Sequence, residues 1–268
     1  MNKVNNNIGI SVVIPAFNRV DLLSRAYDSV FSINPERVEI IVIDDGSDIN
    51  ILENIPNFNK NGILIRKYRK YKNSGAQGAR NMGIRRARFA YMAFLDSDDA
   101  FSQSKIDIIL NILQKESCDL IFHGVEGASK YSVLGNFWYS KLKRIIPLHW
   151  LICIFNPVVT PSLIIRRMNK LGVEKFRFSE DWAYLIRYVT SQTRVFYLNE
   201  NLSIVFRSQG EDGGLSRNVW KMRQGEFEAR RLLFREFSLP IAIIKFGLGG
   251  FFGSLRVIND LIKRRYRA

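Results

Sequence analysis

Runs of apolar residues alternate with segments of helical spacing along the first half of the chain. Several of the runs are apolar almost throughout, which is typical of strands covered on both faces of a sheet. These predicted strands are Ile8–Pro15, Val38–Ile43 and Ala90–Leu95, and Ile63–Arg66 could add a short strand between the last two.

Two segments between these runs have the spacing of helices. From Asp21 to Ser32 apolar residues recur three or four positions apart, and Asp21 could serve as the N-cap. Gly75 to Ala87 is predicted as a helix that starts with small residues. The order strand, helix, strand, strand, helix, strand predicts an α/β fold with a mostly parallel sheet and helices on both faces.

The alternation continues past residue 100 and then changes in character. Residues 124–150 are irregular and aromatic, and residues 207–214 form a polar, glycine-rich loop. The remaining predicted elements are helices at Lys105–Lys115, Asp181–Thr190, 218–237 and 240–264, and strands at Asp119–His123, Leu163–Arg166 and Arg194–Leu198.

Polar clusters follow three of the predicted strands. They are Pro15–Asn18, Asp44–Ser47 and Asp96–Asp99. Parallel sheets bind ligands in the crevice beyond the carboxyl ends of their strands, so we expect these clusters to meet there.

The cluster at Asp96–Asp99 has the oxygen ligands that Mg²⁺ or Mn²⁺ prefers. Clustered carboxylates repel one another unless a positive charge neutralises them. The alternative is that Asp99 or Ser102 simply caps the helix that follows.

The other polar stretches each have two interpretations. Asp44–Ser47 could contact a nucleotide or form an ordinary tight turn. The small residues of Ser74–Asn81 could let a ligand approach, with Arg80 and Asn81 contacting phosphate or sugar hydroxyls, or they could serve close packing of a helix on the sheet. Glu180 and Asp181 could supply a general base, or could only favour the start of a helix.

Composition and charge bound the class of protein. Hydrophobic residues make up 47% of the 268 residues, enough for a proper core. The two cysteines, Cys118 and Cys153, lie in apolar surroundings and are interpreted as buried thiols. No signal peptide is recognised, and no run of about 20 uncharged apolar residues predicts a transmembrane helix.

The net charge of +15 is unevenly placed. Residues 217–268 hold twelve Lys and Arg against four Asp and Glu, a balance of +8. Such a tail suits an anionic membrane surface, while nucleic acid is not expected as a partner. The alternatives are a solvated basic face and a helix packed on the rest of the chain.

Five blocks together resemble the glycosyltransferase family 2 group with the GT-A fold. They are SVVIPAFNR at 11–19, VIDDGS at 42–47, NSGAQGARNMGI at 73–84, AFLDSDD at 93–99 and SEDWAYLIR at 179–187. The resemblance implies a Rossmann-like GT-A domain over residues 1–216, with a nucleotide-binding half at about 8–100 and an acceptor half at about 101–216. Residues 217–268 would be a basic amphipathic helical extension.

The resemblance also implies an inverting transfer from a nucleotide-diphosphate sugar, with UDP-sugars as the default. Asp98 and Asp99 would hold Mn²⁺ or Mg²⁺, and Asp181 would be the catalytic base. Glu180 and Trp182 would face the acceptor, a saccharide or lipid-linked sugar of bacterial surface polysaccharide synthesis. The implied nucleotide-sugar contacts are Pro15, Phe17, Asn18, Asp44, Asp45, Gly75, Arg80, Asp96 and Asp98.

One departure from the family concerns the metal. Many members carry a His in the loop after the last sheet strand, whereas here Arg207 is followed by Ser208 and no His lies after His149. Glu211 or Asp212 could substitute for it, and the loop is expected to be a mobile flap over the donor.

The sequence also leaves rival functions open. A sugar nucleotidyltransferase would need a glycine-rich loop after the first strand, and Ser11–Arg19 has no glycine. A pseudo-transferase that binds a nucleotide without turnover is the other alternative. The expected location is the cytoplasm, at the inner face of the plasma membrane.

Overall fold

The computed structural model describes residues 8–19, 21–127, 139–167, 179–190, 192–206 and 219–265. They fall into two compact units. The first takes in the described residues within 1–129, 159–175 and 194–208, and the second takes in those within 130–158, 176–193 and 209–268. The predicted glycine-rich loop at 207–214, including Arg207, Glu211 and Asp212, lies outside the described residues.

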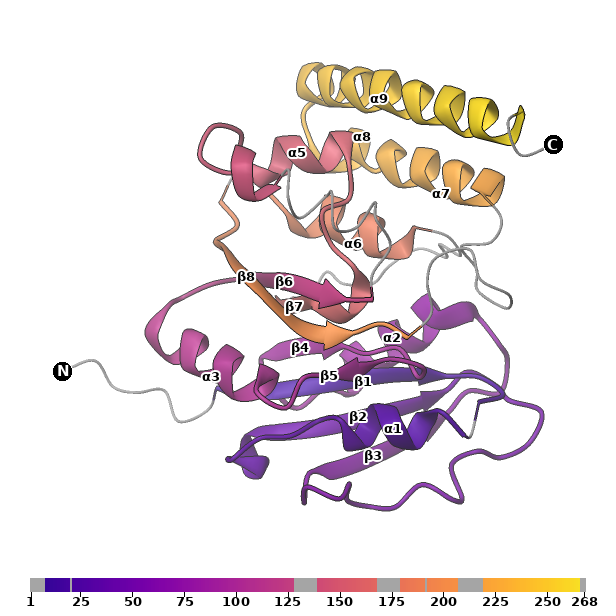
Figure 1. The fold of residues 1–268 in the computed structure, drawn as a ribbon, viewed down its shortest axis with the longest axis vertical. Helices are drawn as coiled ribbons and strands as arrows, with labels where there is room; N and C mark the ends of the chain where they lie inside the picture. The colour runs from indigo at the N-terminus through magenta and orange to yellow at the C-terminus, as the bar shows by residue number, and fades with distance from the viewer. Residues whose placement is uncertain are drawn as a thin grey trace. The chain divides into compact units, whose positions relative to one another are not determined.

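The first unit is built on an eight-stranded sheet of order β3-β2-β1-β4-β7-β6-β8-β5 (Figure 1). Strands β3, β2, β1 and β4 are parallel to one another, β6 and β8 are also parallel, and β7 and β5 pair antiparallel to their neighbours. The strands are β1 (Ile10–Ala16), β2 (Val38–Asp44), β3 (Leu64–Arg69), β4 (Tyr91–Phe94), β5 (Ala100–Phe101), β6 (Leu120–Glu126), β7 (Leu163–Arg166) and β8 (Val195–Ile204). The predicted α/β class with a mostly parallel sheet is therefore confirmed.

Helices cover both faces of this sheet, as predicted. Alternate residues of β1 point to opposite faces. Ile10, Val12 and Ile14 join a core with α1 (Leu23–Asp28) and α3 (Lys105–Lys115). Val13, on the other face, packs against Gly83 of α2 (Gly75–Arg86).

One predicted helix start is wrong in detail, and the capping alternative for the helix after Asp99 does not hold. The helix expected from Asp21 begins at Leu23, and its N-cap residue Leu22 makes no side-chain capping bond. Asp21 accepts only a backbone-carbonyl contact from the hydroxyl of Ser24, so its carboxylate is not the cap. The N-cap of α3 is Ser104, again without a side-chain bond, so neither Asp99 nor Ser102 caps that helix.

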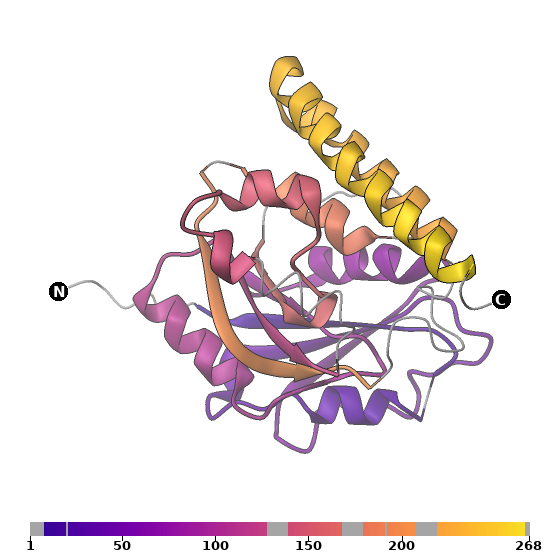
Figure 2. The same cartoon turned by 45° about the horizontal axis from the view of Figure 1, so that its top comes forward.

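The second unit is helical in its described residues. It contains α5 (Leu148–Ile154), α6 (Glu180–Tyr188), α7 (Val219–Arg231), α8 (Leu233–Glu236) and α9 (Leu239–Arg265). Helices α7 and α9 lie side by side in both views, and α9 also packs on α5 and α8 (Figure 1, Figure 2). The two predicted tail helices are thus three.

Helix α9 bears on the expectation that no segment is a transmembrane helix. Its residues Leu239–Val257 have a mean hydropathy of 1.3 over 19 residues and are only 17% buried. By length and composition alone, this stretch of the described chain is long and apolar enough to cross a bilayer, although it includes Lys245 and Arg256.

The close packing of Gly83 against β1 leads to a first prediction about stability. A Cβ at this position would lie 2.3 Å from Cγ1 of Val13. We expect Gly83→Ala to lower the free energy of unfolding by about 1–3 kcal/mol through overpacking. Gly247 of α9 is the control, because a Cβ added there would meet no atom within 4 Å, and Gly247→Ala should stabilise its helix by about 0.5–1 kcal/mol. Urea unfolding measures both, and equal effects of the two substitutions would contradict the packing argument.

Candidate functional site

The loops after β1 and β2 are tied together at the carboxyl edge of the sheet. The backbone N–H of Asn18 donates to the Ser47 hydroxyl at 2.9 Å, and the Asn18 amide exchanges two hydrogen bonds with Asp48. Asn18 has a φ of 50°, a left-handed conformation that Asn tolerates better than most residues. The neighbouring Phe17 is left 41% exposed, an aromatic face at the strand end, while Pro15 is buried within β1.

Asp44 and Asp45 are buried and already have protein partners. Asp44 accepts from the backbone N–H and hydroxyl of Ser47, at 2.9 and 2.5 Å, and its other oxygen lies 3.3 Å from Arg69 Nε. Asp45 pairs with Lys70 at 2.7 Å and accepts from the Ser74 N–H, just before α2. These carboxylates therefore fix the loop after β2 and the start of α2, whatever they contact in a complex.

The cluster after β4 lies at the topological switch point of the sheet, where the chain passes from one side of β1 to the other. Asp98 forms an ion pair with Arg19, which follows β1, and Asp96 forms one with Arg80 of α2. Arg25 donates to the backbone carbonyl of Asp98 at 2.5 Å. Both outer carboxylates are thus compensated by cations from elements distant in sequence.

Asp99 differs from its neighbours because it is buried. Its carboxylate accepts the Phe206 N–H at 3.3 Å, and only 4% of the residue is exposed. Burial raises the pKa of the Asp99 carboxyl to about 8, and the charges of Asp96 and Asp98 act in the same direction. A third negative charge is therefore unfavourable at this position unless a further cation accompanies it.

This donor set fits a hard divalent cation in its chemistry, because carboxylate oxygens are the ligands that Mg²⁺ and Mn²⁺ prefer. The mutual repulsion that contributes to the raised Asp99 pKa is the electrostatic condition a cation relieves. Among the described residues, however, no three His, Cys, Asp or Glu side chains converge as a ready-made metal centre. The residues fit a cation that is completed by ligands from outside the protein.

Helix α2 contributes a feature that sequence reasoning missed. Gln77, in its first turn, is 2% exposed, and neither atom of its amide has a hydrogen-bond partner among the residues that the structure describes. A buried amide without partners costs about 1–3 kcal/mol, so such groups often mark a ligand site. Gly75, at the helix start, has a φ of 81°, which explains why glycine stands there. No signal in the sequence separates Gln77 from an ordinary helix residue.

Asp181 belongs to the second unit, at the start of α6. The amide Nδ2 of Asn156 donates to Asp181 Oδ2 at 2.9 Å, and Asp181 Oδ1 accepts the Trp182 N–H at 2.8 Å. Asn156 itself is held by the Val158 N–H, which donates to its side-chain oxygen at 3.1 Å. The carboxylate of Asp181 is therefore held in one orientation by an amide 25 residues earlier in the chain. The side chain of Glu180 lies outside the described residues.

Trp182 is a support in the interior of this unit. It is 2% exposed, and its indole N–H donates to the Ile152 carbonyl at 2.6 Å. Arg230 and Arg256 lie over the ring at 4.7 and 5.4 Å from its centre. A direct contact with an acceptor would need the ring to leave this packing. The acceptor-side role of Trp182 stays a prediction, and the structure shows the side chain as a buried support of α6.

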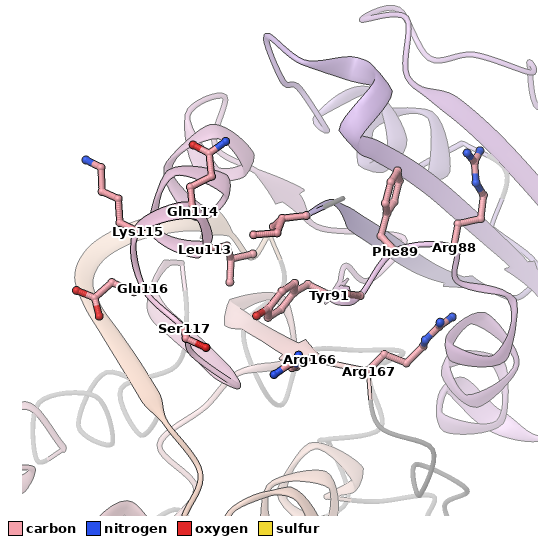
Figure 3. Close-up of a pocket in the computed structure, with 12 residues that line it drawn as sticks. Arg88, Phe89, Tyr91, Leu113, Gln114, Lys115, Glu116, Ser117, Arg166 and Arg167 are labelled. Carbon is pink, nitrogen blue, oxygen red and sulfur yellow. The ribbon is translucent and has the colours of Figure 1, made fainter. Parts of the chain in front are cut away.

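A pocket of about 640 Å³ lies at the amino end of β4, opposite to the end at which the acidic cluster follows (Figure 3). Its lining comes from the residues before β4, the end of α3 and the end of β7, with Phe89, Tyr91 and Arg166 among them. Residues at the amino end of β4 cannot belong to the cluster that follows its carboxyl end. This pocket is therefore separate from the candidate site.

The family of the chain follows from comparison of its sequence with known families. Residues 11–167, which hold the strand-end clusters described above, match the family model described as glycosyl transferase family 2. The chain belongs to this family. A protein of Rickettsia conorii named as an uncharacterized glycosyltransferase is 32% identical over 227 residues, covering 82% of this chain. This chain spans about a third of the length of the first such relatives, 36% in that case.

A second relative is the Escherichia coli enzyme named UDP-Glc:alpha-D-GlcNAc-diphosphoundecaprenol beta-1,3-glucosyltransferase. It is 28% identical over 143 residues, covering 50% of this chain and 55% of the relative.

Solved structures support the fold. Residues 1–349 of Staphylococcus aureus TarS, in complex with UDP-GlcNAc, superpose with a TM-score of 0.66 at 14% identity, covering 89% of this chain and 70% of the other. A Pyrobaculum calidifontis mannosyltransferase in complex with GDP-Man and Mn²⁺ gives a TM-score of 0.60 at 12% identity, covering 94% of this chain and 75% of the other. The GT-A fold expected from the sequence is confirmed.

The raised pKa of Asp99 gives a pH prediction for the metal-free protein. A carboxyl whose folded pKa lies above its unfolded value contributes stability below the unfolded pKa and loses it as pH rises through the folded pKa. Asp99→Asn removes this titration. We expect the free energy of unfolding of Asp99→Asn, relative to that of the wild type, to increase by about 1–3 kcal/mol as the pH rises from 5 to 8.

Urea unfolding in a chelator, at several pH values, measures the effect. Asp21→Asn, which removes an exposed carboxylate, is the control for net charge. A stability difference for Asp99→Asn that does not change with pH would show that the Asp99 carboxyl is not protonated in the folded protein.

Proposed function

We propose that the chain is an inverting glycosyltransferase that moves a sugar from a nucleotide-diphosphate donor, a UDP-sugar, to an acceptor hydroxyl. The observation that carries the proposal is the set of carboxylates and paired cations at the carboxyl edge of the sheet, inside the segment that matches the family. The acceptor is a saccharide or lipid-linked sugar of bacterial surface polysaccharide synthesis, in line with the printed name of the Escherichia coli relative.

The donor's nucleotide is assigned to the loops after β1 and β2. The exposed ring of Phe17 supplies a stacking surface for a base, with Pro15 and Asn18 beside it in sequence. Asp44 and Asp45 hold these loops and the start of α2, and Gly75, Gln77 and Arg80 belong to that helix. The Escherichia coli relative, whose printed name gives UDP-Glc as the donor, supports the choice of a uridine nucleotide.

The diphosphate is assigned to the loop after β4. Asp98 and Asp99 would hold Mn²⁺ or Mg²⁺, and Asp96 would face the sugar-nucleotide beside them. When bound, a divalent cation supplies charge stabilisation for the diphosphate leaving group. Arg19 and Arg80, which now pair with Asp98 and Asp96, provide guanidinium groups that suit phosphate oxygens equally well.

Asp181 is assigned the role of general base. The acceptor oxygen attacks the anomeric carbon, its proton passes to the Asp181 carboxylate, and the bond from the anomeric carbon to the diphosphate oxygen breaks with its electron pair on the diphosphate. One displacement inverts the configuration, and no covalent intermediate on the protein is needed. Asn156 orients the base through its hydrogen bond, and Glu180 is assigned to the acceptor.

The proposed location is the cytoplasmic face of the membrane, where lipid-linked acceptors are presented. The support is the balance of +8 in residues 217–268. Anionic lipid attracts such a segment by about 1 kcal/mol for each basic residue near the surface.

Calorimetric titration with nucleoside diphosphates, with and without Mn²⁺, tests the donor site. We expect UDP to bind in preference to GDP and ADP, and Mn²⁺ to tighten the binding at least about tenfold, or 1.4 kcal/mol. Asp98→Asn should remove the Mn²⁺ effect and leave the weaker, metal-independent binding. Absence of binding by every nucleotide would refute the donor assignment.

Transfer assays with paired variants test the base and its orientation. Asp181→Asn should keep donor affinity and lose at least about a thousandfold in kcat, since both proton transfer and charge are removed. Asn156→Ala should lower kcat about tenfold to a hundredfold with little change in KM for the donor, because the base loses its orientation.

The conservative variant Asn156→Gln separates these roles from folding. We expect Asn156→Gln and Asn156→Ala to unfold with the same thermal midpoint. Asn156→Gln should recover part of kcat, because its longer side chain still carries an amide that can donate to Asp181. Near-normal turnover by Asp181→Asn would show that Asp181 is not the general base. UDP titration of the same variant tests the donor assignment separately, because that assignment does not depend on Asp181.

A further inference from the structure

The outer face of α9 is apolar from Leu239 to Leu255. Large side chains stand open to solvent along it, with Phe251 62% exposed and Ile244 55% exposed. The remaining exposed apolar side chains of this stretch are Leu239, Ile241, Ile243, Leu248, Phe252 and Leu255. Within residues 239–255 the one charged residue is Lys245, and it is fully buried.

Lys245 and Arg256, the charged residues of α9 whose side chains are described, point inward instead. The Lys245 ammonium donates to the His149 carbonyl at 2.8 Å and lies 3.4 Å from the centre of the Phe237 ring. Arg256 donates to the Ile154 carbonyl at 3.1 Å and lies 3.5 Å from a carboxylate oxygen of Glu226. This distribution is the reverse of a helix on a water-soluble protein, which buries its apolar stripe and exposes its charges.

Close backbone contact fixes the rotation of the helix. A Cβ at Gly249 would lie 2.4 Å from the carbonyl oxygen of Cys153, so only glycine allows α9 to approach α5 this closely. Together with the bonds of Lys245 and Arg256 to carbonyls at 149 and 154, this contact anchors α9 along α5. The apolar residues are held outward by the packing of their own unit.

Neighbouring helices extend this surface and add charge at its margin. Phe227 and Phe234 are both exposed and pack on Phe246, with ring centres 5.5 and 5.1 Å apart. An apolar surface with basic residues near it matches a bilayer, whose acyl chains lie beneath anionic headgroups. The exposed cations on α7 and α8 are Lys221, Arg231 and Arg235, and the sequence of α9 ends with Lys263, Arg264 and Arg265.

We propose that the outward face of α9, with Phe227 and Phe234, inserts into the headgroup and acyl boundary of an anionic bilayer, with α9 parallel to the membrane plane. The proposal rests on the proposed function only for the identity of the acceptor, and it specifies how the enzyme meets a lipid-linked one. A spanning orientation would expose the whole circumference of the helix to lipid. Here the side bearing Lys245, Gly249 and Arg256 is occupied by α5 and α7.

Flotation of the full chain with vesicles of phosphatidylglycerol and phosphatidylethanolamine tests the surface. We expect Phe251→Glu and Ile244→Glu each to lower vesicle partitioning at least about tenfold, because each places a charge in the buried apolar layer. Gln224→Glu adds the same charge at an exposed polar position of α7 and should bind as the wild type does. UDP titration of all three variants should be unchanged, which separates this result from the donor assignment.

Salt and depth measurements distinguish the modes of binding. Spin labels on Ile244→Cys, Leu248→Cys, Phe251→Cys and Leu255→Cys should report similar shallow depths, and high salt should weaken binding without abolishing it. A graded depth that passes the bilayer centre would indicate a spanning helix and overturn the proposal.

Two other outcomes would also overturn it. Equal flotation of Phe251→Glu and the wild type would show that the face does not contact lipid. A dimer in sedimentation that is lost in Phe251→Glu, without vesicle binding by the wild type, would assign the face to a second copy of the chain.

Discussion

Charge compensation at the carboxyl edge of the sheet is the constraint on which the candidate donor site depends. Five carboxylates from two strand ends, Asp44, Asp45, Asp96, Asp98 and Asp99, are gathered in one region, and isolated they would repel one another strongly. Arg69, Lys70, Arg80 and Arg19 each pair with one of the first four. These cations come from different elements, so the ion pairs also join the loops after β1, β2 and β4 to β3 and α2.

The same pairs explain why this edge can respond to a ligand. An ion pair near the surface contributes little net stability, since its Coulombic gain is offset by desolvation and lost side-chain entropy. Exchange of Asp98 for another anion as the partner of Arg19 is therefore inexpensive, whereas exchange at the buried Asp44 would leave a carboxylate without compensation. The edge thus combines a fixed inner part, formed by Asp44 and Asp45, with an outer part whose partners can change.

The sequence predicted the elements whose residues are determined locally. Helix α3 and strand β7 begin and end where periodicity placed them, because a helical apolar stripe and a short β-branched run leave little choice. Strand β8 runs to Ile204, six residues past the predicted end. Its polar residues Asn199–Asn201 have no strand pattern. Asn199 and Glu200 fall within a register shift, and Asn201 pairs with Gly124 of β6.

Of the candidate site, the sequence predicted the carboxylates but not the residues that pair with them. The carboxylates stand in blocks that resemble a family, whereas their partners are separated from them by up to 79 residues. Asn156, Gln77 and Arg19 acquire their roles only when the chain has folded. The rotation of α9 is a similar case, because apolar content predicts a helix but not which side faces inward; Gly249 and Lys245 decide that through contacts with α5.

Charge balance links the donor site to its proposed ligand. Arg19, Arg25 and Arg80 surround Asp96, Asp98 and Asp99, and burial keeps the pKa of Asp99 near 8, so at neutral pH the three cations face two full negative charges. A nucleotide diphosphate brings negative charge that the arginines can accept, and a divalent cation brings positive charge that the carboxylates can accept. In the proposed complex, ligand and cation would therefore favour each other's binding, because each would take the partner that the other releases. This reciprocal coupling would weaken if either Arg19 or Asp98 were neutral, and the pair of Arg80 and Asp96 would carry what remains.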